Sequence, residues 1–386
     1  MSLSIFFNPL EDKFLSFSGN KHSFGHKLSK NDSTPVNWQQ HDIALIGIDE
    51  YRGSHAGQKQ NGGPDIIRAA LYNLSGWTSE KKIIDLGNLR PGENYKETQN
   101  RLQSVLELLF ENGIISIIIG GSQDLDLPQY AAAEVLNKMI NFGSIDARID
   151  FEPDVEGVPA DRSHLHKILT HEPNYLYNIC SIAYQSYLVQ KDMISLMEKL
   201  YFEGIRLGAI HDDIKEIEPF LRNLDILSFD ISALRGQDAP GQSEPQPFGM
   251  SPEQACQLAW YSGHGSGVQS IGFYGYQPKQ DKDALTAKLL ATMIWYFVEG
   301  FNHRKIETSF SSNEYQKFTV AFSGSPSELV FYKSLKTDKW WIEIPLLKSQ
   351  NKYRHFKYIP CSYQDYLQAG KGEVPDKWIL AQSRIA

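Results

Sequence analysis

The sequence predicts an α/β protein with three layers, in which helices cover both faces of a mostly parallel central sheet. Between residue 43 and about residue 300, short apolar runs alternate with segments whose apolar residues recur at helical spacing. The run at 114–121 is apolar on both faces, which is typical of a strand in the middle of such a sheet. Repeated strand–helix units form parallel sheets, because each helix returns the chain to the same edge of the sheet.

The strands and helices follow in order along this region. The segment 98–113 has one apolar stripe and ends at Gly113, a residue that commonly terminates helices. Further helices are expected near 127–138, 192–203 and 285–301. The expected strands are the apolar runs at 43–48, 81–89, 114–121, 144–151, 204–210, 225–232 and 268–276.

Two regions flank this α/β domain, for which we predict the boundaries 41–304. Residues 1–40 are polar and aromatic, and we expect an irregular N-terminal arm that lies over the body of the fold. Residues 305–386 contain three short segments with strand character and a final helical segment. We expect them to form a small β-rich C-terminal extension that packs on the core.

Composition excludes several classes of protein. The net charge is −8 and no stretch concentrates lysine and arginine, so the sequence favours no nucleic-acid partner. The longest apolar stretch, 289–298, is too short for a membrane span. The N-terminus has no signal-peptide pattern, and the three cysteines lie far apart, so we expect reduced thiols and a cytoplasmic location.

Acidic residues follow two of the expected strands. Asp146 and Asp150 lie at the end of one strand and Asp230 at the end of another. Ligands of parallel sheets bind beyond the carboxyl ends of the strands, where these carboxylates would surround one point. Clustered carboxylates favour a cation such as Mn²⁺, Mg²⁺ or Ca²⁺ between them. The alternative is that each aspartate caps a helix or forms a turn.

Three motifs in register resemble those of the arginase, agmatinase and formimidoylglutamase superfamily. That family has GGDHS, DAHxD and SxDxDxxDP after successive strands, where this sequence has GGSQD (120–124), DARID (146–150) and SFDISALRG (228–236). The resemblance extends from about Gly62 to about Gly300 and is nearest to the formimidoylglutamase-like branch. It implies an arginase-like fold.

The same resemblance implies a changed metal site. The family binds two Mn²⁺ ions that share a hydroxide, and Asp146, Asp150 and Asp230 match three of its six ligand positions. At the other three positions stand Gln123, Arg148 and Ser232. Gln123 still offers an oxygen, whereas the arginine cannot bind a metal. We therefore expect one Mn²⁺ ion at most, and a site without metal is the alternative.

Three further residues bear on this site. Arg148 either points inward and pairs with Asp146 or Asp230, or points to solvent. Gly275 stands where the family has a glutamate that contacts the cationic end of the substrate. His166 is a candidate remnant of a proton-shuttling histidine of the family, and the alternative is an ordinary surface histidine.

Two functions are compatible with these substitutions. The first is a family member that has weak or no ureohydrolase activity and binds a ligand or serves as a scaffold. The second is an active hydrolase of C–N bonds in linear amidines, such as formimino- or guanidino-amino acids, that uses one metal ion. In either case we expect a small-molecule partner, and the resemblance suggests a homo-oligomer.

Overall fold

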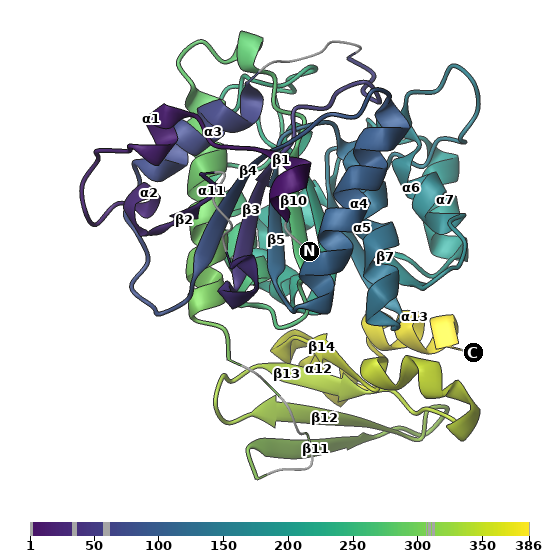
Figure 1. The fold of residues 1–386 in the computed structure, drawn as a ribbon. Coiled ribbons are helices and arrows are strands. Elements are labelled where there is room, and N and C mark those ends of the chain that lie inside the picture. The colour runs from purple at the N-terminus through teal and green to yellow at the C-terminus, as the bar shows by residue number, and fades with distance from the viewer. Residues whose placement is uncertain are drawn as a thin grey trace.

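The computed structural model describes residues 3–32, 37–56, 62–305, 307, 310 and 313–385. A large sheet with helices on both faces forms the body of the protein, and a small second sheet lies below it (Figure 1). This arrangement confirms the predicted three-layer α/β/α class.

The central sheet has ten strands within the described residues. They are β1 (Phe7–Asn8), β2 (Ser29–Lys30), β3 (Ile43–Gly47), β4 (Ile83–Leu89), β5 (Ile115–Ile119), β6 (Ile140–Ile145), β7 (Leu176–Tyr184), β8 (Glu203–Arg206), β9 (Ile226–Asp230) and β10 (Ser270–Tyr274). The order is β1-β4-β3-β5-β10-β9-β6-β7-β8, and β2 pairs with β4. All pairings are parallel except that of β1 with β4.

The register of the central strands aligns their carboxyl ends. Ile145 at the end of β6 pairs with Phe229 of β9, and Asp230 pairs with Tyr274 at the end of β10. The residue that follows each strand therefore lies at a similar level on its neighbour. This register brings Asp146 and Asp230 to adjacent strand ends.

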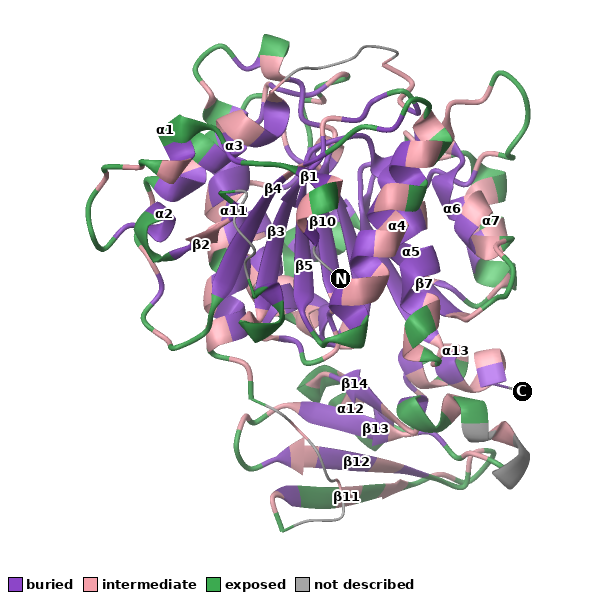
Figure 2. Cartoon of the chain, viewed as in Figure 1, coloured by how far each residue is buried: buried purple, intermediate pink, exposed green. Residues whose placement is uncertain are grey.

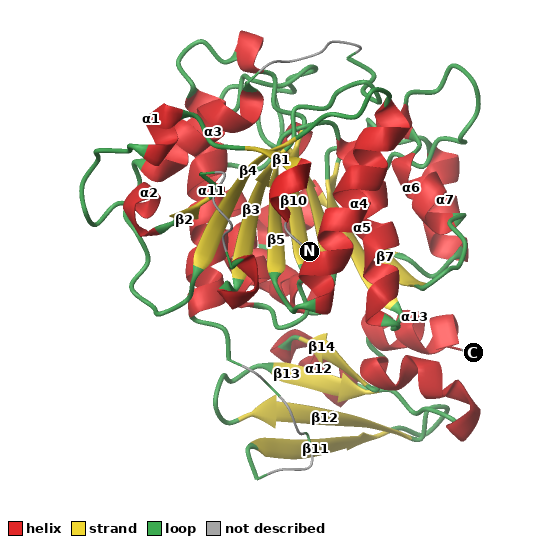
Figure 3. Ribbon diagram, in the orientation of Figure 1, coloured by secondary structure: helices red, strands yellow, loops and turns green. Residues whose placement is uncertain are grey.

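Helices cover both faces of this sheet, and its strands are buried almost throughout (Figures 2 and 3). Odd-numbered residues of β3, such as Leu45, face one core, and even-numbered residues, such as Ile46, face the other. One core is covered by α1 (Asp12–Leu15), α2 (Phe24–Lys27), α3 (Gly63–Tyr72), α8 (Leu207–Asp212), α9 (Glu218–Arg222), α10 (Pro252–His264) and α11 (Leu285–Asn302). The other is covered by α4 (Tyr95–Glu111), α5 (Asp126–Ala132), α6 (His164–Leu169) and α7 (Lys191–Lys199).

Several boundaries differ from those predicted. The strand expected at 144–151 is β6, which ends at Ile145. The prediction extended too far because Ile149 and Phe151 are buried in the following loop and give it the alternating pattern of a strand. The predicted strand 204–210 is divided between β8 and α8. Strand β7 was not predicted.

The N-terminal arm is more regular than expected. Its segments β1 and β2 extend the edge of the central sheet beside β4. Residues 33–36 of the predicted arm lie outside the described part of the chain. The arm thus contributes strands to the sheet, in addition to the helices α1 and α2 that pack on it.

The C-terminal extension contains a separate antiparallel sheet with the order β11-β12-β13-β14. Its strands and helices are β11 (Tyr315–Ala321), β12 (Glu328–Ser334), β13 (Trp340–Glu343), β14 (Tyr358–Cys361), α12 (Tyr363–Gly370) and α13 (Asp376–Ile385). This confirms the expectation of an additional β-rich unit. Its core is rich in aromatic residues and includes the ring of Tyr177 from β7.

The extension is attached at the amino ends of the central strands. Tyr177 stacks on Phe356, with 3.7 Å between ring centroids. Arg222, which is buried at the end of α9, donates to the carbonyl oxygen of Trp340 at 2.9 Å. Nζ of Lys339 lies 3.0 Å from Oε1 of Glu218, which also pairs with Arg222. The interface therefore combines aromatic stacking with a mostly buried network of charges.

Two predictions about cysteines and membranes can be compared with the structure. Cys180, Cys256 and Cys361 are buried free thiols, as expected. Among the described residues, no helix has the length and apolar character needed to cross a membrane.

The Arg222 contacts predict an effect on stability. We expect Arg222→Ala to lower the free energy of unfolding by about 2–4 kcal/mol, because Glu218 would remain mostly buried without its nearest cation. Urea denaturation measures this loss, and limited proteolysis shows whether the extension becomes accessible. Arg235→Ala is the matched control, since Arg235 forms an ion pair with nearby Asp238 at a more exposed position. Equal losses in the two variants would contradict this role of Arg222.

Glu218 predicts how the interface responds to acid. Burial alone would raise its pKa, but Arg222 and Lys339 lower the pKa from 4.5 to about 2. A carboxylate with a lowered folded-state pKa stabilises the protein above its unfolded pKa, and this stabilisation is lost as pH falls from about 4.5 towards 2. Wild-type protein should therefore lose about 1–2 kcal/mol more stability than Glu218→Gln in this range. Acid titrations of both proteins, followed by their unfolding, measure this difference. Equal losses of stability in the two proteins would refute the expectation.

Candidate functional site

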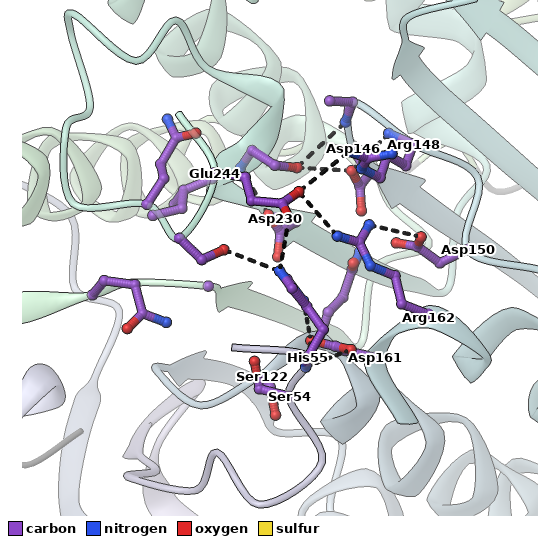
Figure 4. Close-up of a pocket in the computed structure, with 18 of the residues that line it drawn as sticks. Ser54, His55, Ser122, Asp146, Arg148, Asp150, Asp161, Arg162, Asp230 and Glu244 are labelled. Carbon is purple, nitrogen blue, oxygen red and sulfur yellow. Dashed lines mark hydrogen bonds and ion pairs between the residues drawn. The ribbon is translucent and has the colours of Figure 1, made fainter. Parts of the chain in front are cut away.

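A pocket lies at the carboxyl ends of β3, β5, β10, β9 and β6, which are neighbours in the sheet. Its cavity volume is about 50 Å³, and side chains from strand ends and loops converge on it (Figure 4). The charged side chains and the histidine that line it are His55, Asp146, Arg148, Asp150, Asp161, Arg162, Asp230 and Glu244. The structure thus brings the three predicted aspartates together at one pocket.

Ser232 connects two of these aspartates. Its hydroxyl donates to Oδ1 of Asp146 at 2.7 Å, and its backbone N–H donates to Oδ1 of Asp230 at 2.7 Å. Asp146 also accepts from the backbone N–H of Arg148 at 2.8 Å. One oxygen of each carboxylate is therefore held by the protein itself.

The third aspartate pairs with an arginine. Nη1 of Arg162 lies 3.3 Å from Oδ1 of Asp150, which is buried. Nη2 of the same guanidinium lies 3.2 Å from Oε2 of Glu244. Figure 4 shows Arg162 between these two carboxylates. Arg162 is the last residue of the η5 turn (Ala160–Arg162) and was not predicted as a site residue from the sequence.

Arg148 differs from the prediction that its side chain pairs with Asp146 or Asp230. Its guanidinium donates to the carbonyl oxygen of Leu188 and lies 3.2 Å from Oε2 of Glu244. It still lines the pocket, so it does not point away into solvent either. The inward cation beside an aspartate is Arg162, because that side chain approaches Asp150 from the adjoining loop.

His55 approaches the pocket from the loop after β3. Its Nδ1 lies 2.8 Å from Oδ2 of Asp161, and its backbone N–H donates to the same carboxylate. Burial alone would raise the pKa of Asp161, but the hydrogen bonds of His55 lower it. This contact directs Nε2 towards Ser243 at 3.3 Å and Glu244 at 4.0 Å.

His164, rather than His166, lies near one of the predicted aspartates, Asp150. Both rings belong to α6, but only His164 is fully buried, with Nδ1 2.7 Å from Asp126 and Nε2 3.9 Å from Asp150. Burial would lower the pKa of His164, but Asp126 raises it to about 9, so the buried ring is a cation at neutral pH. His166 does not line the pocket, and the prediction of a catalytic role for it gains no support.

The aspartates also influence one another. Burial and the nearby Asp146 raise the pKa of Asp230 to about 7 and raise that of Asp150 well above 3.8. Burial would likewise raise the pKa of Glu244, but Arg162, His55 and Arg148 lower it. The lowered pKa therefore favours a negative charge on Glu244, which lies beside the two arginines.

Gln123 contributes an amide to the floor of the pocket. Its nitrogen donates to the hydroxyl groups of Ser144 at 3.2 Å and Ser228 at 3.1 Å. Both serines lie on strands of the central sheet, β6 and β9. Gln123 is therefore held by the sheet through its amide nitrogen.

The donor set does not fit a centre with two metal ions. Within the described residues, no three His, Cys, Asp or Glu side chains converge closely enough to hold a metal ion. One oxygen of Asp150 is paired with Arg162, and one oxygen of Asp146 with Ser232. Two arginines bring fixed positive charge to the same pocket, which opposes a second divalent cation.

Gly275 follows β10 in a backbone conformation that favours glycine, with φ of +85°. A Cβ atom added there would lie 2.8 Å from Oδ2 of Asp230. A glutamate at this position would therefore require the strand end or Asp230 to move.

Comparisons with known proteins agree with this architecture. A model of the arginase family matches residues 41–299. Formimidoylglutamase from Staphylococcus haemolyticus is 26% identical over 263 residues, which are 65% of this chain and 82% of that protein. The crystal structure of Trypanosoma cruzi formiminoglutamase with Mn²⁺ superposes with a TM-score of 0.66 at 18% identity, over 73% of this chain and 99% of that one. Formimidoylglutamase from Bacillus subtilis gives a TM-score of 0.64 at 14% identity, over 79% and 93%.

Gly275 generates a prediction about stability. Gly275→Ala should lower the free energy of unfolding by about 2–4 kcal/mol, because the new methyl group meets Asp230 in addition to the strain of a positive φ. Gly113→Ala is the matched control, since Gly113 has φ of +68° and open space around its Cβ position. Chemical denaturation should show a loss of only about 1 kcal/mol for the control. Similar losses at both positions would remove the contact with Asp230 as a cause.

Proposed function

We propose that this chain, which belongs to the arginase family and is related to formimidoylglutamase, binds a small polar ligand in the strand-end pocket and has weak or no ureohydrolase activity. The observation that carries this proposal is the position of Arg162. Its guanidinium lies between Asp150 and Glu244, so a fixed side-chain charge neutralises a carboxylate that matches a metal ligand of the family.

The remaining contacts support the same proposal. Ser232 holds Asp146 and Asp230 by two hydrogen bonds of 2.7 Å, and buried His164 lies beside Asp150 as a second cation. Hydrogen bonds and permanent positive charge thus stabilise these buried carboxylates, as divalent ions otherwise would. The pocket retains donors and acceptors that face its cavity, which suits a polar small molecule.

A second candidate is an active hydrolase of C–N bonds in linear amidines that uses one metal ion. The observation that favours it is the raised pKa of both Asp150 and Asp230, because carboxylates that repel each other attract a cation. Asp146, Asp150, Asp230 and Gln123 would then hold a single Mn²⁺, after the carboxylates move closer together. A bound Mn²⁺ supplies an activated water. The Trypanosoma cruzi relative was crystallised with Mn²⁺.

The cellular location and the oligomeric state also remain predictions. The cytoplasmic location rests on the sequence pattern alone. The homo-oligomer rests on the family resemblance, and analytical ultracentrifugation of the full chain tests it.

Metal binding separates the two candidates. We expect purified protein to contain much less than one Mn²⁺ per chain, and millimolar Mn²⁺ to leave the melting temperature unchanged, because the charge of Arg162 already balances Asp150. Elemental analysis and thermal melting measure both quantities. Near-stoichiometric Mn²⁺ with a clear stabilisation would instead support the hydrolase and justify assays on formimino and guanidino substrates.

A double variant is the positive control for this measurement. Arg148→His together with Ser232→Asp restores two family ligand types and should increase Mn²⁺ affinity relative to the wild type. Asp230→Asn in the same background should remove the increase. If Asp230→Asn changes nothing, Asp230 is not part of the metal site.

A further inference from the structure

Glu244 lines the pocket, and three donor side chains lie near its carboxylate. Its Oε2 lies 3.2 Å from Nη2 of Arg148 and 3.2 Å from Nη2 of Arg162. Its Oε1 lies 4.0 Å from Nε2 of His55. One carboxylate therefore lies close to two guanidinium groups from the connection between β6 and α6 and to an imidazole from the loop after β3 (Figure 4).

Each of these three donors also has a contact with a residue other than Glu244. Arg162 is held by Asp150, which is buried at 3.3 Å from it. Arg148 is held by the carbonyl oxygen of Leu188, and His55 by Asp161. Each donor would keep its place if the Glu244 carboxylate left, so the position is a preformed site for a planar anion.

Glu244 itself is the least fixed member of the group. Its side chain is 50% exposed, whereas that of Arg162 is 16% exposed. The chain on either side is anchored by hydrogen bonds, from Gly236 N–H to the carbonyl oxygen of Gln246 and from Gln242 to the carbonyl oxygen of Leu234. Rotation of one side chain into solvent therefore vacates the site while the loop backbone stays in place.

The size of the cavity requires such a rotation. Its volume of about 50 Å³ holds roughly three or four water molecules, which is too little for an amino-acid-sized ligand. Glu244 and Ser243 both line this cavity. A carboxylate that binds between Arg148 and Arg162 must therefore displace the Glu244 side chain.

The geometry points to a carboxylate-binding subsite formed by Arg148, Arg162 and His55, in which Glu244 is an internal stand-in that the carboxylate of a small organic acid displaces. This inference rests on the proposed ligand-binding function and names its ligand class. Displacement exchanges one carboxylate for another on the same guanidinium groups, so the charge around buried Asp150 stays balanced. A neutral ligand offers no such exchange, and this selects for acids.

Calorimetric titration with glutarate, a small dicarboxylate, tests the subsite. If Glu244 occupies it about 90% of the time, apparent affinity is reduced about tenfold, and Glu244→Gln should bind glutarate about tenfold more tightly than the wild type. Adding Arg148→Gln to Glu244→Gln should lower the affinity by about tenfold, because one of the two charged guanidinium contacts to the anion is lost. Arg148 is partly exposed, so this variant is expected to fold.

Two controls separate local displacement from net charge. Glu156→Gln makes the same charge change at an exposed residue that does not line the pocket, and it should leave glutarate affinity unchanged. Glutaramide has the shape of glutarate without its charge and should not bind to Glu244→Gln.

Each opposite result overturns a defined part of the inference. Equal glutarate affinity in the wild type and Glu244→Gln would show that Glu244 is no competitor. Equal binding of glutaramide, or no binding of glutarate to Glu244→Gln at millimolar concentration, would refute a carboxylate subsite. These results leave the metal measurement unchanged, so the subsite and the proposed loss of hydrolysis fail independently.

Discussion

Carboxylates that are buried side by side repel one another and lose their hydration, so the protein must surround them with donors or positive charge. In this chain the parallel register places Asp146 and Asp230 at neighbouring strand ends, and Asp150 follows in the adjoining loop. Hydrogen bonds from Ser232 and the charge of Arg162 meet this requirement. The ligand class that we propose follows from these hydrogen bonds and this charge.

Positive charge at the pocket comes from side chains that are themselves fixed. Arg162 is held between two carboxylates, and His164 lies fully buried against Asp126. A guanidinium remains charged over the whole physiological range of pH and offers planar donors suited to carboxylates. These fixed charges are the basis of our proposal that the pocket recognises an organic anion.

The extension and the pocket lie at opposite ends of the same strands. Tyr177 and Arg222 hold the extension at the amino ends, whereas the pocket opens at the carboxyl ends, and none of its lining residues belongs to the extension. Contacts at the amino ends therefore contribute to stability without touching a ligand. The sheet between them is buried, and its parallel pairing keeps the strand ends in register for the site.

Alternating apolar runs were enough to predict the three layers and to place Asp146 and Asp230 at strand ends, because strand and helix periodicity is local. Asp150 was expected at the end of the same strand as Asp146 but lies in the loop after β6. The family resemblance marked Gln123, Arg148, Ser232 and Gly275. The sequence could not show that Arg162, His55 and Glu244 join them, or that Arg148 turns to Glu244, because these contacts connect loops separated by as many as 188 residues. Only the tertiary structure brings such loops together, since packing and charge pairing decide where each long side chain points.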